Sequence, residues 1–258
     1  MLRMADGLRV VTLPSREAMG LAAARVAAGY LRAAVAERGQ AVMLLAAAPS
    51  QAEFLDELAR QPGVPWEAVR ALQLDEYVGL GPGAAGSFSS WLRRHLVQRV
   101  EGLRFVAMDG TASPQEECAR YAALLEPAPD LACVGFGENG HLAFNDPPDA
   151  RLDDPRRVRV VALSEASRWQ QVHDGCFPSI EAVPTHALTL TVPAILSSRH
   201  VVAVVPGARK AAAVRRALLE PVDAGCPASA LRRHGDAQLF LDPAAAAGLA
   251  AVPSAPGA

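Results

Sequence analysis

The stretch "AVMLLAAAPSQAEFLDEL", Ala41–Leu58, decides the fold class. Its first six residues, Ala41–Ala46, form a continuous apolar run, which is typical of a strand buried on both faces of a sheet. After a short loop, an apolar helical stripe begins at Phe54, and Ser50 is expected to cap this helix. A buried strand followed directly by a helix indicates an α/β domain with a mostly parallel sheet.

Strand-like and helix-like segments alternate along the rest of the chain. Further strands are expected at Leu8–Leu13, Val69–Leu74, Leu103–Met108, Asp130–Gly135, Arg157–Leu163, Ala187–Val192, His200–Val205 and Ala237–Asp242. Further helices are expected from Ser15 through Arg38, and at Ser87–Val97, Pro114–Leu125 and Pro206–Leu219, the last after a turn. Without a repeat or a long linker, the pattern predicts one domain over residues 1–250. Residues 251–258, which are small or proline, are expected to form a flexible tail.

The bulk composition excludes several classes of protein. The chain has 258 residues, 51% of them hydrophobic, and a net charge of −2, so it can bury a sizeable core. That charge gives no argument for a nucleic-acid or membrane partner. The apolar run Ala18–Ala36 is interrupted by Arg25 and Arg32 and does not predict a membrane span. Four scattered cysteines and no recognisable secretory signal predict a cytoplasmic protein.

Unusual residues gather where ligands of such sheets bind. In parallel α/β sheets, ligands bind in the crevice at the carboxyl ends of the strands. The loops expected there are Ala47–Ser50, Asp75–Gly79, Gly135–Asp146 and Pro206–Lys210. We therefore expect these four loops to meet and to build a small-molecule site.

The loop "GFGENGHLAFNDPP", Gly135–Pro148, contains a titratable group among glycines. His141 can exchange a proton near neutral pH, and Asp146, five residues later, could orient it. The alternative is a structural histidine bound to a carbonyl group. The glycine spacing superficially resembles a dinucleotide loop, but "HLAFN" is not a helix start, so a dinucleotide site is disfavoured.

Two adjacent acids follow the strand at Val69–Leu74. Within "LQLDEYVGL", Asp75 or Glu76 could serve as a general base, because burial raises the pKa of a carboxyl group. The alternative is that Asp75 caps a turn and Glu76 is solvated.

A basic turn precedes the last predicted helix. In "PGARKA", Gly207 is followed by Arg209 and Lys210, which would bring two cations and free backbone N–H groups together as a phosphate site. The alternative is a solvated basic turn.

Other kinds of site find no support in the sequence. His95, His173, His186, His200 and His234 show no metal-ligand spacing, so no metal site is predicted. No G-x-S-x-G element indicates a serine nucleophile. No cofactor is predicted.

Three motifs together resemble the glucosamine-6-phosphate deaminases, also called isomerases. These motifs are "LDEYVGL" (Leu74–Leu80), "GENGHLAFNDPP" (Gly137–Pro148) and "PGARKA" (Pro206–Ala211), in the family's order and at similar spacing. The similarity extends through "VPTHALTLTVPAIL" and "CPASALRRH". It implies a modified Rossmann-like α/β fold and an enzyme that converts glucosamine 6-phosphate to fructose 6-phosphate and ammonia, without a cofactor.

The resemblance also implies roles for individual residues. His141 would move protons at the ring oxygen, and Asp75 would carry a proton between C2 and C1. Asp146 would support His141. Asn139 stands where the best-known branch has an aspartate; it could hydrogen-bond the imidazole but not stabilise its charge.

Substrate and phosphate binding are predicted at Ser50, Gln51, Glu76, Gly137, Arg168 and Lys210. His173 lies with Arg168 in the segment where the family supplies another cation. The loop Ala46–Gln51 lacks the family's glycine, and Pro49 has no N–H to offer a phosphate.

Two alternatives to a deaminase stay open at this point. One is a 6-phosphogluconolactone hydrolase, a related class whose motif usually reads G-H-T-A-S where this chain has His141–Asn145. The other is a non-catalytic sugar-phosphate-binding relative, suggested by Asn139 and the loop without glycine. The expected partner is a small amino-sugar phosphate; a homo-oligomer is possible.

Overall fold

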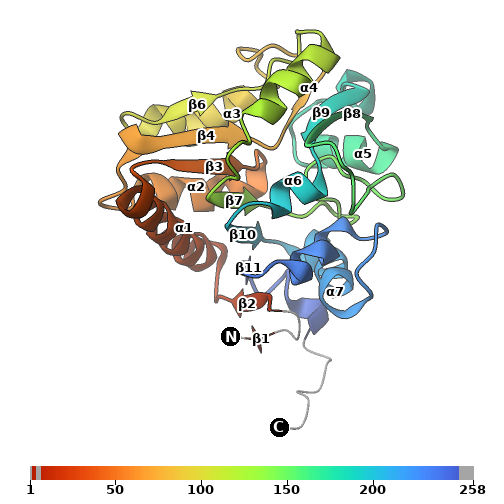
Figure 1. Ribbon diagram of the computed structural model, residues 1–258. Helices are drawn as coiled ribbons and strands as arrows, with labels where there is room; N and C mark the ends of the chain where they lie inside the picture. Colours follow the sequence, from red (N-terminus) through yellow and green to blue (C-terminus); the bar gives the residue numbers. More distant parts are fainter. Residues whose placement is uncertain (1, 4–6, 250–258) are drawn as a thin grey trace.

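The computed structural model describes residues 2–3 and 7–249, so the predicted tail at 251–258 lies outside the described residues. An eight-stranded sheet has the order β1-β2-β11-β10-β7-β3-β4-β6 (Figure 1). Its strands are β1 (Leu2–Arg3), β2 (Arg9–Thr12), β3 (Ala41–Leu45), β4 (Val69–Gln73), β6 (Arg104–Val106), β7 (Leu131–Val134), β10 (His200–Val205) and β11 (Ala237–Leu241). Every neighbouring pair is parallel except β1 and β2, which confirms the predicted α/β class.

Helices cover both faces of this sheet (Figure 1). They are α1 (Arg16–Arg38), α2 (Ala52–Ala59), α3 (Phe88–His95), α4 (Pro114–Ala123), α5 (Glu165–His173), α6 (Val192–Leu196) and α7 (Ala211–Leu219). Alternate residues of the strands pack into two hydrophobic clusters. In β3, Met43 and Leu45 pack with α1 and α2, whereas Val42 and Leu44 lie on the face covered by α4, α6 and α7.

Local capping explains where the first helix begins and ends. The hydroxyl of Ser15 accepts a hydrogen bond from the N–H of Ala18, and Gly39 ends α1 in the left-handed conformation. The prediction for Ser50 was wrong. A 3₁₀ turn, η1 (Pro49–Gln51), intervenes because proline starts this turn one residue earlier, and α2 begins at Ala52 without a side-chain cap.

A second, three-stranded sheet is antiparallel, with the order β5-β9-β8. Its strands are β5 (Asp75–Tyr77), β9 (His186–Leu190) and β8 (Val158–Ala162). The predicted strands at Arg157–Leu163 and Ala187–Val192 exist, but they lie here and not in the parallel sheet. The prediction that Asp75 begins a loop was wrong, because Asp75 pairs with Thr189 of β9.

The two sheets are joined at Leu74. Its N–H donates to the carbonyl of Leu45 in the parallel sheet, and its own carbonyl accepts from the N–H of Leu190 at the end of β9. Asp75 is therefore the first residue beyond the junction.

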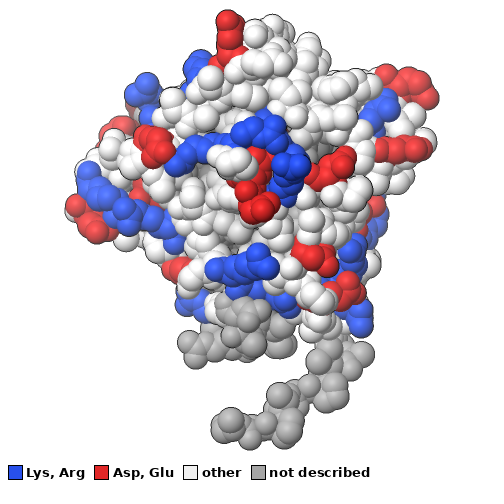
Figure 2. Space-filling view, turned by 45° about the vertical axis from the view of Figure 1, so that its right-hand side comes forward, with Lys and Arg blue, Asp and Glu red and all other residues white. Residues whose placement is uncertain are grey.

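Acidic and basic side chains intermingle on the face shown in Figure 2, without a large patch of one sign. This distribution agrees with the small net charge. Within residues 2–3 and 7–249, no helix is long and apolar enough to cross a membrane.

Candidate active site

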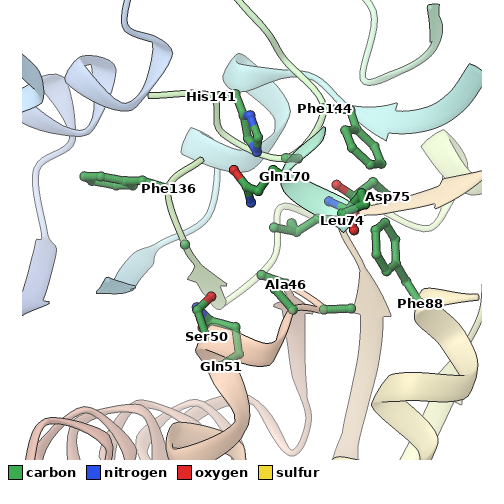
Figure 3. Close-up of a pocket in the computed structure, with 15 residues that line it drawn as sticks. Ala46, Ser50, Gln51, Leu74, Asp75, Phe88, Phe136, His141, Phe144 and Gln170 are labelled. Atoms are coloured by element: carbon green, nitrogen blue, oxygen red, sulfur yellow. The ribbon is translucent and has the colours of Figure 1, made fainter. Parts of the chain in front are cut away.

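A cavity opens at the carboxyl ends of β3, β4 and β7 (Figure 3). Its polar lining consists of Ser50, Gln51, Asp75, His141, Gln170 and Gln171. Its apolar wall includes Phe88, Phe136 and Phe144. Residues from three of the four segments predicted to meet line this cavity, one of them from β5, whereas Pro206–Lys210 contributes no lining residue.

His141 and Asp146 form a hydrogen-bonded pair, as the sequence predicted. Nδ1 of His141 lies 3.0 Å from Oδ1 of Asp146. The same oxygen accepts from Asn139 Nδ2 at 2.9 Å and from the hydroxyl of Ser167 at 2.7 Å, and Oδ2 accepts from the hydroxyl of Ser164 at 3.0 Å. Burial alone would raise the pKa of Asp146, but the hydrogen bonds and the charge of His141 hold it well below its usual range.

These contacts fix the orientation of the His141 imidazole and determine which of its nitrogens carries the proton. Nδ1 faces the carboxylate and also lies 3.0 Å from Ser167 Oγ, so Nδ1 carries the proton. No described residue hydrogen-bonds Nε2, which leaves that nitrogen available as a proton acceptor on a ring that lines the cavity. His141 is therefore equipped to exchange protons with a bound molecule.

Two residues of the same loop act differently from prediction. Asn139 does not bond the imidazole: it donates to Asp146, and its Oδ1 accepts from the backbone N–H of His141. Gly137 is not a lining residue. A Cβ atom there would lie 2.2 Å from the His141 ring, so Gly137 provides the space in which the ring lies.

Asp75 faces the cavity from a different element, the start of β5 (Figure 3). It is 8% exposed, and within the described chain its carboxylate accepts no hydrogen bond. Burial, and secondly the charge of Glu76, raise the pKa of Asp75 well above its usual range. An unpartnered buried carboxylate of this kind can accept a proton near neutral pH.

Glu76 was expected either in solvent or on the substrate, and neither prediction is correct. It is fully buried and does not line the cavity. Side chains alternate along a strand, so Glu76 points away from the face of Asp75. Its carboxylate instead accepts hydrogen bonds from the N–H groups of Phe88 and Ser89 at the start of α3.

Ser50 and Gln51, which were predicted to bind substrate or phosphate, line the cavity. The side-chain amide of Gln51 donates to the carbonyl of Val204 at 3.0 Å. Gly135 accommodates this amide, because a Cβ there would lie 2.8 Å from Gln51 Nε2. Gly135 thus gives the Gln51 side chain the room that it needs, although the loop Ala46–Gln51 itself contains no glycine.

The predicted cations occupy different surroundings. Lys210 is buried beside the cavity loops; burial lowers its pKa, and the charges of Asp174 and Glu138 oppose that effect. Arg209 pairs with Asp174 at 2.9 Å and with Glu138 at 3.3 Å.

Arg168 is not a lining residue. It donates to the carbonyls of Ile180 and Val183, because it lies on α5 one residue, or about 100° of helical turn, away from Ser167.

One face of α5 was missed by sequence reasoning. Ser164, Ser167, Gln170 and Gln171 all reach the cavity or Asp146. Gln170 also accepts the N–H of Glu138 in the histidine's own loop at 2.9 Å. The signal was present as polar residues at helical spacing in "SEASRWQQ", but a polar helical face is also the usual sign of solvent exposure.

Within the described ranges, no group of histidine, cysteine, aspartate or glutamate side chains could hold a metal ion. All four cysteines are free thiols.

Comparison with known proteins places these features in context. The family model described as glucosamine-6-phosphate isomerases/6-phosphogluconolactonase matches residues 14–240. The glucosamine-6-phosphate deaminase of Arthrobacter sp. (strain FB24) is 35% identical over 250 residues, covering 94% of this chain and 93% of that protein. Glucosamine-6-phosphate deaminase 1 of Bacillus subtilis (strain 168) is 31% identical, covering 93% and 98%.

Solved structures agree with this. A monomeric glucosamine-6-phosphate deaminase superposes with a TM-score of 0.85 at 30% identity, covering 93% of this chain and 99% of that one. A 6-phosphogluconolactonase from Shewanella baltica OS155 has a TM-score of 0.76 at 21% identity, covering 93% and 99%, and shares the fold.

Proposed function

The chain belongs to the family of glucosamine-6-phosphate isomerases and 6-phosphogluconolactonases, and we propose that it is a glucosamine-6-phosphate deaminase. In this proposal it converts glucosamine 6-phosphate and water to fructose 6-phosphate and ammonia. The observation that carries the proposal is that two proton-transfer groups, Asp75 and His141, face one cavity from different elements. The activity named for its relatives requires two such groups, one at the sugar ring oxygen and one at carbon.

His141 acts first, on the closed sugar ring. Its Nε2 takes the proton of the C1 hydroxyl, the bond between C1 and the ring oxygen breaks, and the proton passes to that oxygen. One group must both accept and return this proton, which suits an imidazole. Asp146 remains ionised and stabilises the charged imidazole while it holds the proton.

Asp75 then acts on the open chain. Its carboxylate takes the proton from C2, the electron pair forms a double bond between C1 and C2, and the C1 carbonyl oxygen takes a proton from the substrate's own ammonium group. Asp75 returns its proton to C1, which leaves an iminium ion at C2. Water adds to C2 and the nitrogen leaves as ammonium ion, giving the ketose.

The phosphate group of the substrate is assigned to Ser50, Gln51 and Lys210. Support comes from the position of Ser50 and Gln51 in the cavity lining and from the burial of Lys210, on which the charge of Glu138 in the histidine's loop acts. Asp75, His141, Asp146 and Asn139 remain the proposed catalytic group, with Asn139 acting through Asp146.

We place the reaction in amino-sugar metabolism, as a step of N-acetylglucosamine breakdown in the cytoplasm. The free state of all four thiols supports a reducing compartment.

The test is ammonia release and fructose 6-phosphate formation from glucosamine 6-phosphate, with Asp75→Asn as control. Turnover by the parent protein and none by the folded variant is expected. Full activity in Asp75→Asn would refute the assigned role. A folded parent protein that opens 6-phosphogluconolactone, and leaves the amino sugar unchanged, would show a lactonase instead.

A further inference from the structure

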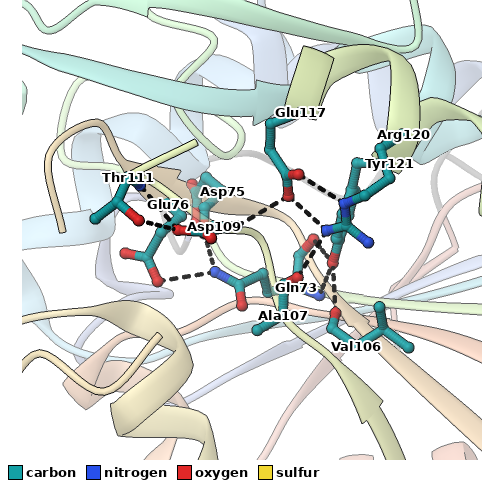
Figure 4. Close-up of polar contacts among 10 residues, drawn as sticks. All are labelled: Gln73, Asp75, Glu76, Val106, Ala107, Asp109, Thr111, Glu117, Arg120 and Tyr121. Atoms are coloured by element: carbon teal, nitrogen blue, oxygen red, sulfur yellow. Dashed lines mark hydrogen bonds and ion pairs between the residues drawn. The ribbon is translucent and has the colours of Figure 1, made fainter. Parts of the chain in front are cut away.

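Asp75 and Glu76 are adjacent acids with opposite surroundings (Figure 4). Because they lie on a strand, their side chains point to opposite faces. Asp75 faces the cavity without a hydrogen-bond donor in the described part of the chain, whereas Glu76 is enclosed by donors. The two carboxylates are therefore expected to have different roles.

Four donors saturate the carboxylate of Glu76. Oε1 accepts from the N–H groups of Tyr77 and Phe88, each at 3.0 Å. Oε2 accepts from the N–H of Ser89 at 3.0 Å and from Gln73 Nε2 at 3.1 Å. Burial raises the pKa of Glu76 above its usual value, and the hydrogen bonds from the four donors act against that rise. Each oxygen faces two donors, so a proton could be added only by breaking one of these bonds, and this geometry favours the ionised form of Glu76.

The side-chain amide of Gln73 fixes Asp75 and Glu76 relative to each other. Gln73 Nε2 also donates to the backbone carbonyl of Asp75 at 2.8 Å (Figure 4). The backbone N–H of Gln73 donates to Tyr121 Oη at 2.7 Å, which ties the group to α4. The negative charge of Glu76 is thus held at a constant place behind Asp75.

Several titratable groups surround Asp75. On β5 these are Glu76 and Tyr77, and across the cavity is His141, backed by Asp146; Asp174 and Cys176 act on Tyr77. Of these, Glu76 is the one that neighbours Asp75 on the strand and shares the donor Gln73 Nε2 with it, and its charge adds to the effect of burial in raising the pKa of Asp75.

We propose that Glu76 is a positioning residue whose fixed negative charge strengthens Asp75 as a proton acceptor, without itself touching the substrate. This inference rests on the proposed function, in which Asp75 takes the proton from C2. A like charge disfavours the ionised form of its neighbour, so it makes that neighbour a stronger base.

The decisive measurement is a carbon-13 NMR titration of the Asp75 carboxyl group in the free protein and in Glu76→Gln. The Asp75 midpoint is expected to fall by about one pH unit in the variant, because the like charge is gone. This readout needs no turnover, so it stands or falls separately from the deaminase assignment. If the enzyme is active, the acid limb of its kcat/KM profile moves to lower pH by the same amount and the plateau rate falls.

Ser87→Ala is the matched control. Ser87 caps α3 by accepting the N–H of Ser90 at 3.1 Å, so its loss weakens the same helix end without changing charge. The control is expected to lower the melting temperature and leave the Asp75 midpoint in place. If Ser87→Ala lowered the Asp75 midpoint by the same amount, the shift would come from the weakened helix end, and Glu76 would be a purely structural residue.

A second variant covers the case in which Glu76→Gln does not fold. Gln73→Lys places a cation against Glu76 and keeps the carboxylate on the α3 N–H groups. It too is expected to lower the Asp75 midpoint. An unchanged midpoint in whichever variant folds would overturn the proposal.

Discussion

The hydroxyl oxygen of Ser167 lies 2.7 Å from Oδ1 of Asp146, so the helix that lines one side of the cavity is bonded to the carboxylate that orients His141. The same hydroxyl lies 3.0 Å from His141 Nδ1. Ser164, which caps α5, bonds the other oxygen of Asp146 at 3.0 Å. The position of α5 and the orientation of the imidazole are therefore coupled.

Replacing Ser167 by alanine tests this coupling. Loss of one buried hydrogen bond to a charged group is expected to lower kcat about tenfold, with a smaller change in KM. Ser167→Thr retains the hydroxyl and should recover most of the rate. Ser197→Ala, an exposed serine at the end of α6, is the control and should behave as the parent protein. Equal kcat values for Ser167→Ala and the parent would show that the coupling has no part in catalysis.

Gly137→Ala is expected to displace the His141 ring. The added Cβ would meet ring atoms at 2.2 Å, and these atoms are held on their other side by Asp146 and Ser167. We expect a loss of activity of at least about a hundredfold, since misplacement near 1 Å has that cost. The measurement is kcat/KM with the melting temperature.

Gly29→Ala is the control for that change. Gly29 lies within α1 with open space at the Cβ position, so alanine should stabilise the helix by about 1 kcal/mol and leave activity intact. Parent-like activity in Gly137→Ala would mean that the ring is not held where the structure has it.

Asp75 and Asp146 should affect stability with opposite signs. The pKa of Asp75 is raised on folding, so its ionised form destabilises the fold, and this penalty grows as the pH rises through the folded pKa. Asp75→Asn is therefore expected to raise the free energy of unfolding by roughly 1 kcal/mol at pH 8, while abolishing turnover.

For Asp146 the pKa is lowered on folding. Its ionised form stabilises the fold above the unfolded value of 3.8, and that contribution is lost as the pH falls below this value. Asp146→Asn should lower the free energy of unfolding by about 1–3 kcal/mol at neutral pH. Denaturant unfolding of both variants at several pH values checks the pair, and shifts of the same sign would contradict it.

The parallel sheet could be predicted because its signals are local. Apolar runs such as Ala41–Leu45 and the capping serine at Ser15 act within a few residues of where they stand. The antiparallel sheet could not, since β5 has three residues and its pairing with β9 joins Asp75 to Thr189, far along the chain.

The site shows the same division. The pairing of His141 with Asp146 spans five residues, and the loop motif predicted it. The burial of Glu76 depends on α3, and the inward turn of Ser167 depends on how α5 lies over the loop, so neither followed from the motif. The prediction placed Arg168 at the site, but on α5 it is the neighbouring Ser167 that faces inward.

The junction at Leu74 limits how related chains can diverge in length here. One residue, Leu74, contributes its N–H to one sheet and its carbonyl to the other, so an insertion between Gln73 and Asp75 would separate the two hydrogen bonds that join the sheets. Extra residues can be accommodated instead after Tyr77, in the glycine-rich surface loop that precedes α3. Length can thus vary beyond β5, while the junction keeps the distance between Asp75 and the parallel sheet constant.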